Sequence, residues 1–176
     1  MEFYEVEPSL DNYWRAIILF GRNVASYKFS LAKSLYEFHA VPNDLITIEQ
    51  LAKPFSHHLC EHLKHSPKQI TSKSSTFLGA CSDYNDGNLS YEKLISQTVK
   101  LGFNNVIDAF HVVNNDEINQ RFFIDERKTN KGIRITENFF KLAENEQFKS
   151  FKHETEARWR LVEEGWKMGI AKSLIH

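Results

Sequence analysis

The sequence predicts a mainly α-helical fold with one small β-hairpin. Three observations favour this class. Apolar residues recur at helical spacing in most of the chain, capping patterns precede several of these segments, and residues 121–136 instead resemble two short strands. The chain has 176 residues, of which 41% are hydrophobic and 26% charged, as in ordinary soluble globular proteins. We expect one domain over residues 1–176, with a helical lobe at 1–80, helices and the hairpin at 81–145, and a C-terminal helix at 146–176.

The longest apolar stretch, residues 13–38, predicts two helices that meet at Gly21. Its apolar side chains fall on nearly every side of a helical projection, which is typical of a helix buried all round. Polar side chains nevertheless lie within it, and a buried charge is costly unless it is paired. Arg22, Asn23 and Lys28 are therefore either satisfied inside the core or face a functional cleft.

Capping and turn signals divide the next part of the chain into shorter helices. Thr47 and Gln50 have the spacing of a capping box, so we expect a helix from this point to Pro67. Pro54 should kink this helix or reset its start. A polar loop then leads to a short helix at 76–84.

The middle of the chain has the element order of a winged helix-turn-helix. Helices are expected at 91–101 and 106–113 with a turn at Gly102 between them, and strands at 121–127 and 132–136 form the hairpin. The order helix, turn, helix, hairpin indicates a DNA-binding winged domain only weakly, because many helical domains contain a hairpin.

The last element is a long helix from about residue 146 to 174, which follows a shorter helix at 137–143 capped by Thr136. Its apolar positions recur at spacings of three and four, which predicts one buried face. This stripe consists of Phe148, Phe151, Thr155, Trp159, Val162, Trp166, Gly169 and Ile170.

Charge and cysteine content limit the classes of function. A net charge of −1 argues against a dedicated non-specific binder of nucleic acids, so such binding would need a local patch. Cys60 and Cys81 are too few for a disulfide framework. The N-terminus lacks the pattern of a signal peptide, and Arg15 and Arg22 interrupt the best candidate for a membrane span. We therefore expect a cytoplasmic protein without a membrane partner.

A histidine-rich segment, SHHLCEHLKH, is the densest cluster of metal-binding residue types. His58, His62 and His65 would share one face of a helix. Two histidines four residues apart can bind zinc, but the order H-E-x-x-H is missing. A solvated or half-buried helix face is the favoured interpretation over a zinc site.

Two further patterns are candidates for catalysis. Asp108 and His111 are three residues apart on a helix, but no nucleophile stands beside them, so a structural pair is favoured. Glu126 and Lys128 end a predicted strand, as carboxylate and lysine do in many metal-dependent nucleases. Surface charges on a hairpin are the favoured interpretation, and no catalytic residue is assigned.

The hairpin and one loop are better candidates for binding. The segment from residue 121 to 134 has five positive and two negative side chains, and the segment at 64–73 has positive side chains without acids. Such elements suit contacts to DNA phosphates, although a solvated basic turn balanced by acidic helices explains them equally well. The candidates are Lys64, Lys68, Lys73, Arg121, Arg127, Lys128, Lys131 and Arg134.

Five segments resemble the N-terminal region of bacterial HNH endonuclease-like proteins. They are YWRAIILFGRNVASYKFSLAKSL, KQITSKSSTFLGAC, LGFNNVIDAFHVVN, RFFIDERK and ETEARWRLVEEGW. The resemblance spans nearly the whole chain, from about residue 4 to 175. In that family the nuclease module follows this region and contains a water-activating histidine, a bound divalent metal and often a structural zinc.

Nothing in this chain matches that module, which has Cys-x-x-Cys pairs and Asp-His and Cys-Asn dipeptides. The resemblance therefore implies the non-catalytic part of a nuclease, without a cofactor of its own, that positions or senses DNA or mediates assembly in restriction or phage defence. Its partners would be DNA and a downstream nuclease domain or second subunit. The alternative is a helical interaction or oligomerisation module, in which Trp166, Ile170, Leu174 and Ile175 form an exposed patch. A second alternative is a metal-dependent nuclease that uses Glu126 and Lys128.

Overall fold

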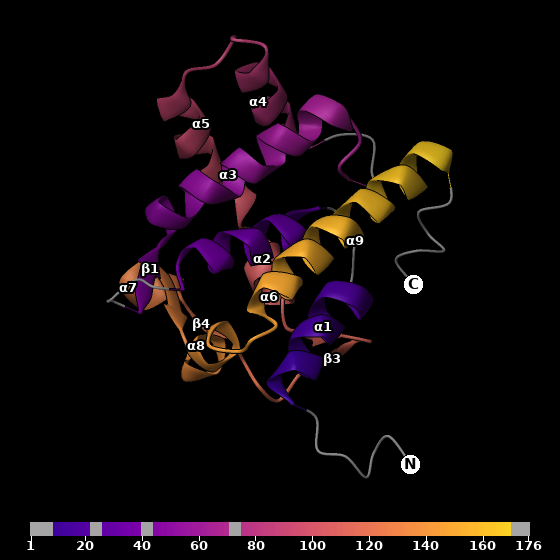
Figure 1. Ribbon diagram of the computed structural model, residues 1–176. Coiled ribbons are helices and arrows are strands. Elements are labelled where there is room, and N and C mark those ends of the chain that lie inside the picture. The colour runs from indigo at the N-terminus through magenta and orange to yellow at the C-terminus, as the bar shows by residue number, and fades with distance from the viewer. Residues whose placement is uncertain (1–8, 22–25, 40–43, 71–74, 170–176) are drawn as a thin grey trace.

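The computed structural model describes residues 9–21, 26–39, 44–70 and 75–169. These residues form a mainly helical body with two small antiparallel sheets, which confirms the predicted fold class (Figure 1). None of the helices in the described ranges is long and apolar enough to cross a membrane.

Helix α2 (Tyr27–Glu37) lies at the centre of the body and is preceded by α1 (Leu10–Phe20). The side chain of Ser9 caps α1, and Gly21 ends it in an extended conformation, so the predicted break at Gly21 is present. The second helix begins at Tyr27, whereas the sequence suggested residue 22; residues 22–25 lie outside the described residues. Most of α2 is buried, because α3 and α9 both pack on it (Figure 1).

Helix α3 (Ile48–His65) begins with the predicted capping box. The Thr47 hydroxyl accepts from the backbone N–H of Gln50 at 3.1 Å, and the Gln50 side chain accepts from the backbone N–H of Thr47 at 2.9 Å. The helix continues through Pro54 without a new start. Helices α4 (Thr76–Asn85) and α5 (Tyr91–Gln97) then pack against α3, and α5 runs on into the π-helical turn η2 (Thr98–Gly102).

The segment after η2 does not have the geometry of a winged helix-turn-helix. The predicted helix at 106–113 is a single turn, α6 (Val106–Ala109), and the side chains of Val106 and Ile107 are buried. A recognition helix must be long enough to lie in the major groove, and this four-residue turn is too short. A short hairpin of β2 (Val112–Val113) and β3 (Asp116–Glu117) replaces the end of the expected helix.

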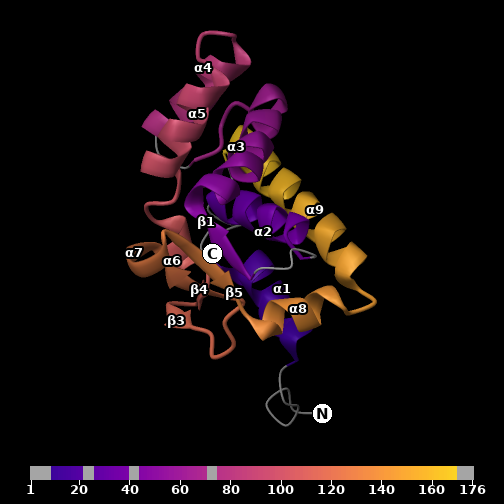
Figure 2. The same ribbon diagram turned by 90° about the vertical axis from the view of Figure 1, so that its left-hand side faces the viewer.

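The predicted hairpin is present and belongs to a three-stranded sheet in the order β1-β5-β4 (Figure 2). Its strands are β4 (Phe123–Glu126) and β5 (Gly132–Ile135), and the helical turn α7 (Arg127–Asn130) joins them. Strand β1 (Leu45–Thr47) pairs with β5 and was not predicted. At Gly132 the backbones approach so closely that a Cβ atom would collide with the carbonyl oxygen of Ile46.

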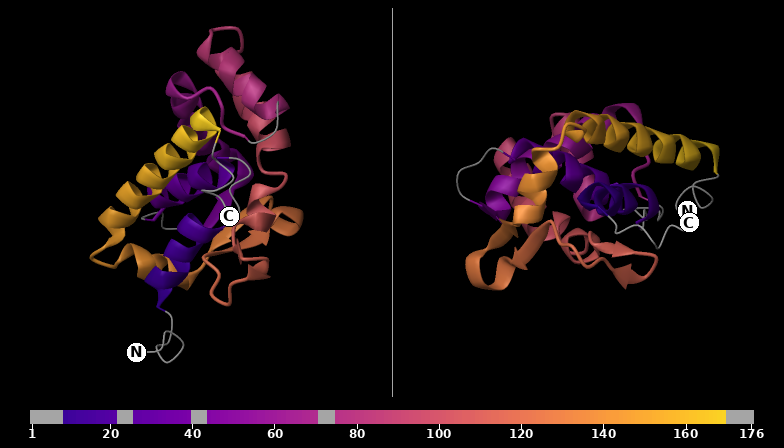
Figure 3. Two further views of the ribbon diagram at one scale, coloured as in Figure 1. Left: turned by 90° about the vertical axis from the view of Figure 1, so that its right-hand side faces the viewer. Right: turned by 60° about the horizontal axis from the view of Figure 1, so that its bottom comes forward.

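The last two helices close the body. Helix α8 (Glu137–Ala143) lies beside α1, and α9 (Phe148–Met168) packs along α1 and α2 (Figure 2). Figure 3 shows α9 on one face, with α7 and the β2–β3 hairpin on the opposite face. The predicted apolar stripe is buried from Phe148 to Trp166. Trp166 therefore cannot contribute to the exposed patch suggested above, and Ile170, Leu174 and Ile175 lie outside the described residues.

A hydrogen-bonded joint connects three helices inside the core. The Trp14 indole N–H of α1 donates to the Tyr36 hydroxyl of α2 at 2.8 Å. The Tyr36 oxygen lies 2.7 Å from the Thr155 hydroxyl of α9, and Thr155 donates to the Phe151 carbonyl at 2.8 Å. Because a buried polar group without a partner is costly, this series of hydrogen bonds favours one relative position of α1, α2 and α9.

Candidate functional site

The predicted basic hairpin is largely neutralised by acidic side chains. Arg127 lies 2.8 Å from Asp125 and 3.1 Å from Asp108, and it also donates to the Phe103 carbonyl at 3.1 Å. The hydrogen bonds from Arg127 lower the pKa of Asp125. Arg127 therefore ties the hairpin to the segment after η2 and is not free for phosphate.

The other two arginines are also paired. Arg134 lies 2.6 Å from Glu126 and 2.7 Å from Asp44, and its hydrogen bonds lower the pKa of Glu126. Arg121 bonds the carboxylate of Glu117 and the Phe123 carbonyl. The three arginines thus face five acids, so they contribute no excess of positive charge to this surface. Lys128 and Lys131 are exposed and form no ion pair within the described ranges.

The second predicted basic segment is not part of the same surface. Lys64 pairs with Glu61 at 2.8 Å, Lys68 is exposed, and Lys73 lies outside the described residues. Lys64 is near the C-terminal end of α3, whereas β1 and the hairpin are at its N-terminal end. An α-helix of this length spans about 27 Å, so the two groups of lysines are far apart.

Of the three predicted cleft residues only Lys28 is described, and it is buried. Its Nζ atom lies 5.1 Å from the centre of the Phe29 ring and has no hydrogen-bond partner among the described residues. Burial, and then the positive charge of Arg158, lower the pKa of Lys28 well below its ordinary value. Lys28 therefore lies in the core, but without the hydrogen-bond partner that the first of the two interpretations expected, while Arg22 and Asn23 lie outside the described residues.

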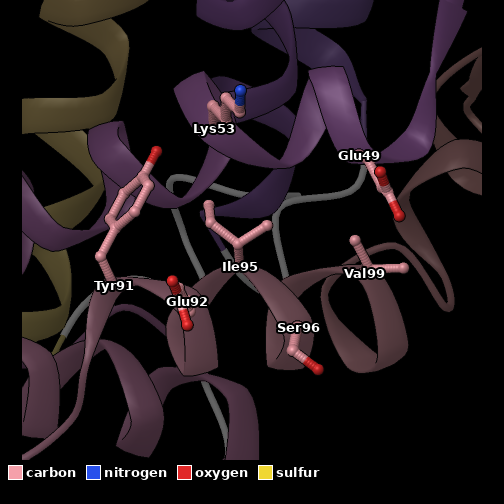
Figure 4. A pocket seen from close by; sticks show the side chains of 7 residues that line it. All are labelled: Glu49, Lys53, Tyr91, Glu92, Ile95, Ser96 and Val99. Carbon is pink, nitrogen blue, oxygen red and sulfur yellow. The ribbon is translucent and has the colours of Figure 1, made fainter.

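An open, largely apolar groove lies between α3 and the α5–η2 helix. Tyr91, Ile95 and Val99 are four residues apart and point from α5–η2 toward α3 (Figure 4). Glu49 and Lys53 line the opposite wall from α3. The cavity measures about 420 Å³; Tyr91 and Val99 are 48% and 37% exposed, while Ile95 between them is half-buried against the core.

A second cavity of about 510 Å³ extends the groove toward the hairpin. It shares Glu49 and Val99 with the first cavity and reaches Phe103, Arg127 and Lys131. The groove thus has an apolar floor with a cationic end. The π-helical turn forms part of its wall, and such turns occur frequently at functional sites.

A polar cleft of about 670 Å³ lies between α3 and α9. Two of the predicted histidines line this cleft, and each is paired with glutamate. His58 lies 2.6 Å from Glu37, while His62 is buried between Glu163 at 2.7 Å and Glu156 at 3.0 Å. The predicted half-buried face is therefore present. Within the described ranges no three His, Cys, Asp or Glu side chains come close enough to hold a metal ion.

The His62 site has further partners that sequence analysis missed. Its ring stacks on Trp159 with 3.4 Å between centroids and 2° between planes. Gln69 joins Glu163 to Trp159, because its amide donates to Glu163 at 2.5 Å and its oxygen accepts from the Trp159 N–H at 2.9 Å. Glu163 follows Trp159 by four residues, so its place on the buried stripe was a signal that it would need a partner.

The predicted pairs Asp108–His111 and Glu126–Lys128 do not assemble. Asp108 binds Arg127, and the Nε2 atom of the buried His111 accepts from the backbone N–H of Phe122 at 3.0 Å. Glu126 is held by Arg134 and follows Asp125 directly in β4, so the two carboxylates point to opposite faces of the strand.

Comparisons with known proteins add no assignment. No family model matches the chain, and neither the curated proteins nor the solved structures gave a match.

Proposed function

We propose that this chain is a non-catalytic module of an HNH endonuclease-like protein, and that it holds a polypeptide segment of the nuclease in the groove between α3 and α5–η2. The resemblance of the sequence supports the family. The row of Tyr91, Ile95 and Val99, of which Tyr91 and Val99 are exposed, supports the mode of action, because an apolar row with polar rims is typical of grooves that bind helices.

The lining of the groove indicates what the bound segment looks like. Apolar side chains of the segment lie on Ile95 and Val99, and an acidic side chain near one end faces Arg127 and Lys131. Arg127 is already paired, so Lys131 provides the free charge. Complementary charge at this end fixes the direction of the segment more than its affinity.

Titration calorimetry of the chain against the nuclease module, produced as a separate polypeptide, tests this proposal. Val99→Glu places a charge on the floor of the groove and is expected to weaken binding at least about tenfold, or 1.4 kcal/mol. Leu161→Glu is the matched control, because Leu161 is 46% exposed but lies on α9. Equal affinity of Val99→Glu and wild type would contradict the groove as the docking site.

Contact of the hairpin with duplex DNA is a second candidate function. The observation that favours it is the pair of exposed lysines at the end of the hairpin, Lys128 and Lys131, which form no ion pair with the described residues. Two phosphate contacts correspond to a slope of about −1.8 in a plot of log affinity against log salt concentration. The double variant Lys128→Glu/Lys131→Glu should abolish this binding, whereas Arg127 is left unchanged because it closes internal contacts. Duplex binding that survives the double variant would exclude this candidate.

A further inference from the structure

His62 is held by carboxylates at both ring nitrogens. Its Nδ1 atom lies 2.7 Å from Glu163 Oε2, and its Nε2 atom lies 3.0 Å from Glu156 Oε1. A neutral imidazole has one N–H group and can donate to only one carboxylate, whereas an imidazolium donates to both. With both carboxylates ionised, the geometry therefore requires the charged form of His62.

The two carboxylates differ in their other partners. Glu156 also receives hydrogen bonds from Lys33 at 2.6 Å and from Arg160 at 2.9 Å. Glu163 is buried and, among the described residues, has only the neutral amide of Gln69 as a partner besides His62. The other titratable or charged groups around the cleft are His57, His58, Glu61 and His65 of α3 and Glu164 and Lys167 of α9.

We infer that His62 is a pH-sensitive clamp between α3 and α9. As an imidazolium it holds Glu156 and Glu163 together. When His62 loses a proton, the remaining proton stays on Nδ1, because Glu163 is buried and has no cationic partner other than His62 within the described ranges. The lone pair of Nε2 then faces Glu156, which separates from the ring and keeps its bonds to Lys33 and Arg160.

Opposing influences on the pKa of His62 determine whether the clamp opens at acid or at alkaline pH. Burial works against the charged form of His62, but the hydrogen bonds from its nitrogens to Glu156 and Glu163 outweigh it and raise its pKa above the ordinary value. A group with a raised pKa in the folded state contributes stability that is complete below its unfolded pKa of about 6.5 and is lost as the pH rises through the folded pKa. The clamp is thus closed at mildly acidic pH and opens on the alkaline side.

Nuclear magnetic resonance of the histidine ring carbons gives the first test. In the wild-type chain the His62 resonance is expected to titrate above pH 6.5. Glu156→Gln removes one of the two carboxylates that stabilise the imidazolium and leaves Glu163 in place. The midpoint of the His62 titration should therefore fall by about one pH unit or more. A wild-type midpoint at or below 6.5, or a midpoint that Glu156→Gln leaves in place, would overturn the inference.

Thermal unfolding at pH 6.5 and 9.5 gives the second test. The wild-type midpoint should fall over this range, and the fall should be smaller in His62→Gln, which has no titrating ring. His65→Gln is the matched control, because His65 is exposed on the same helix and it should retain the wild-type fall. If His62→Gln does not fold, the change in the His62 titration midpoint in Glu156→Gln is sufficient to test the inference. A fall in His62→Gln as large as in wild type would refute the clamp.

Discussion

Tyr36→Phe should destabilise the protein far more than the loss of one oxygen atom suggests. The Tyr36 hydroxyl accepts the Trp14 N–H at 2.8 Å and lies 2.7 Å from the Thr155 hydroxyl, and all three side chains are buried. Removing it leaves the Trp14 N–H without a partner, which costs about 1–3 kcal/mol, and it also deletes the bond to Thr155. We expect a total loss of about 2–3 kcal/mol in the free energy of unfolding.

Urea denaturation followed by tryptophan fluorescence measures this loss, and in a chain of this size it corresponds to a fall of about 4–12 °C in the thermal midpoint. Tyr13→Phe is the matched control, because it removes the same atom from a half-buried side chain in α1 and should change the stability by less than about 0.5 kcal/mol. Adding Thr155→Val to Tyr36→Phe completes a double-mutant cycle with an expected coupling above about 0.5 kcal/mol. If Tyr36→Phe costs no more than Tyr13→Phe, the hydrogen-bonded joint does not stabilise the contact of the three helices.

Three other variants test separate parts of the fold by chemical denaturation. Gly132→Ala should destabilise by about 1–3 kcal/mol, since a Cβ atom collides with the Ile46 carbonyl; wild-type stability would show that β1 can move away. Gly79→Ala in α4 meets nothing within 4 Å and should stabilise by about 0.5–1 kcal/mol; a loss would contradict the open position. Burial, and then the charge of Arg121, lower the pKa of His111 to about 3, so this histidine favours unfolding as the pH falls from about 6.5 toward 3. His111→Gln should reduce this loss of stability at acid pH, and a dependence of stability on pH equal to that of wild type would refute the role of His111.

Elements with local signals were predicted well from the sequence. The capping box of α3 depends on residues three apart, and the buried stripe of α9 on spacings of three and four, so both are visible in a short window. Strand β1 has only three residues and is defined by pairing with β5, more than 80 residues later in the chain. The β2–β3 hairpin was missed although Asn114 and Asn115 occupy its two-residue turn with φ angles of 53° and 69°, a conformation that asparagine tolerates.

The candidate site was predicted less well because charge pairing is not local. A count along residues 121–134 finds an excess of positive charge, but Arg134 is paired with Asp44, which is 90 residues away, and Arg127 with Asp108. The groove could not be predicted from the sequence either, because its two walls come from helices that are separate in the chain. The apolar stretch allowed a core position for Lys28, but not the absence of a hydrogen-bond partner for its Nζ atom among the described residues.

The central position of α2 has a consequence for the sequence variation that the protein tolerates. Eight of its eleven residues are buried, among them Lys28, Ser30 and Ser34 as well as its apolar side chains. A deep mutational scan should therefore find an almost unbroken run of intolerant positions along this helix, with Glu37 as a permissive end. Its backbone amides should also be among the last to exchange with deuterium.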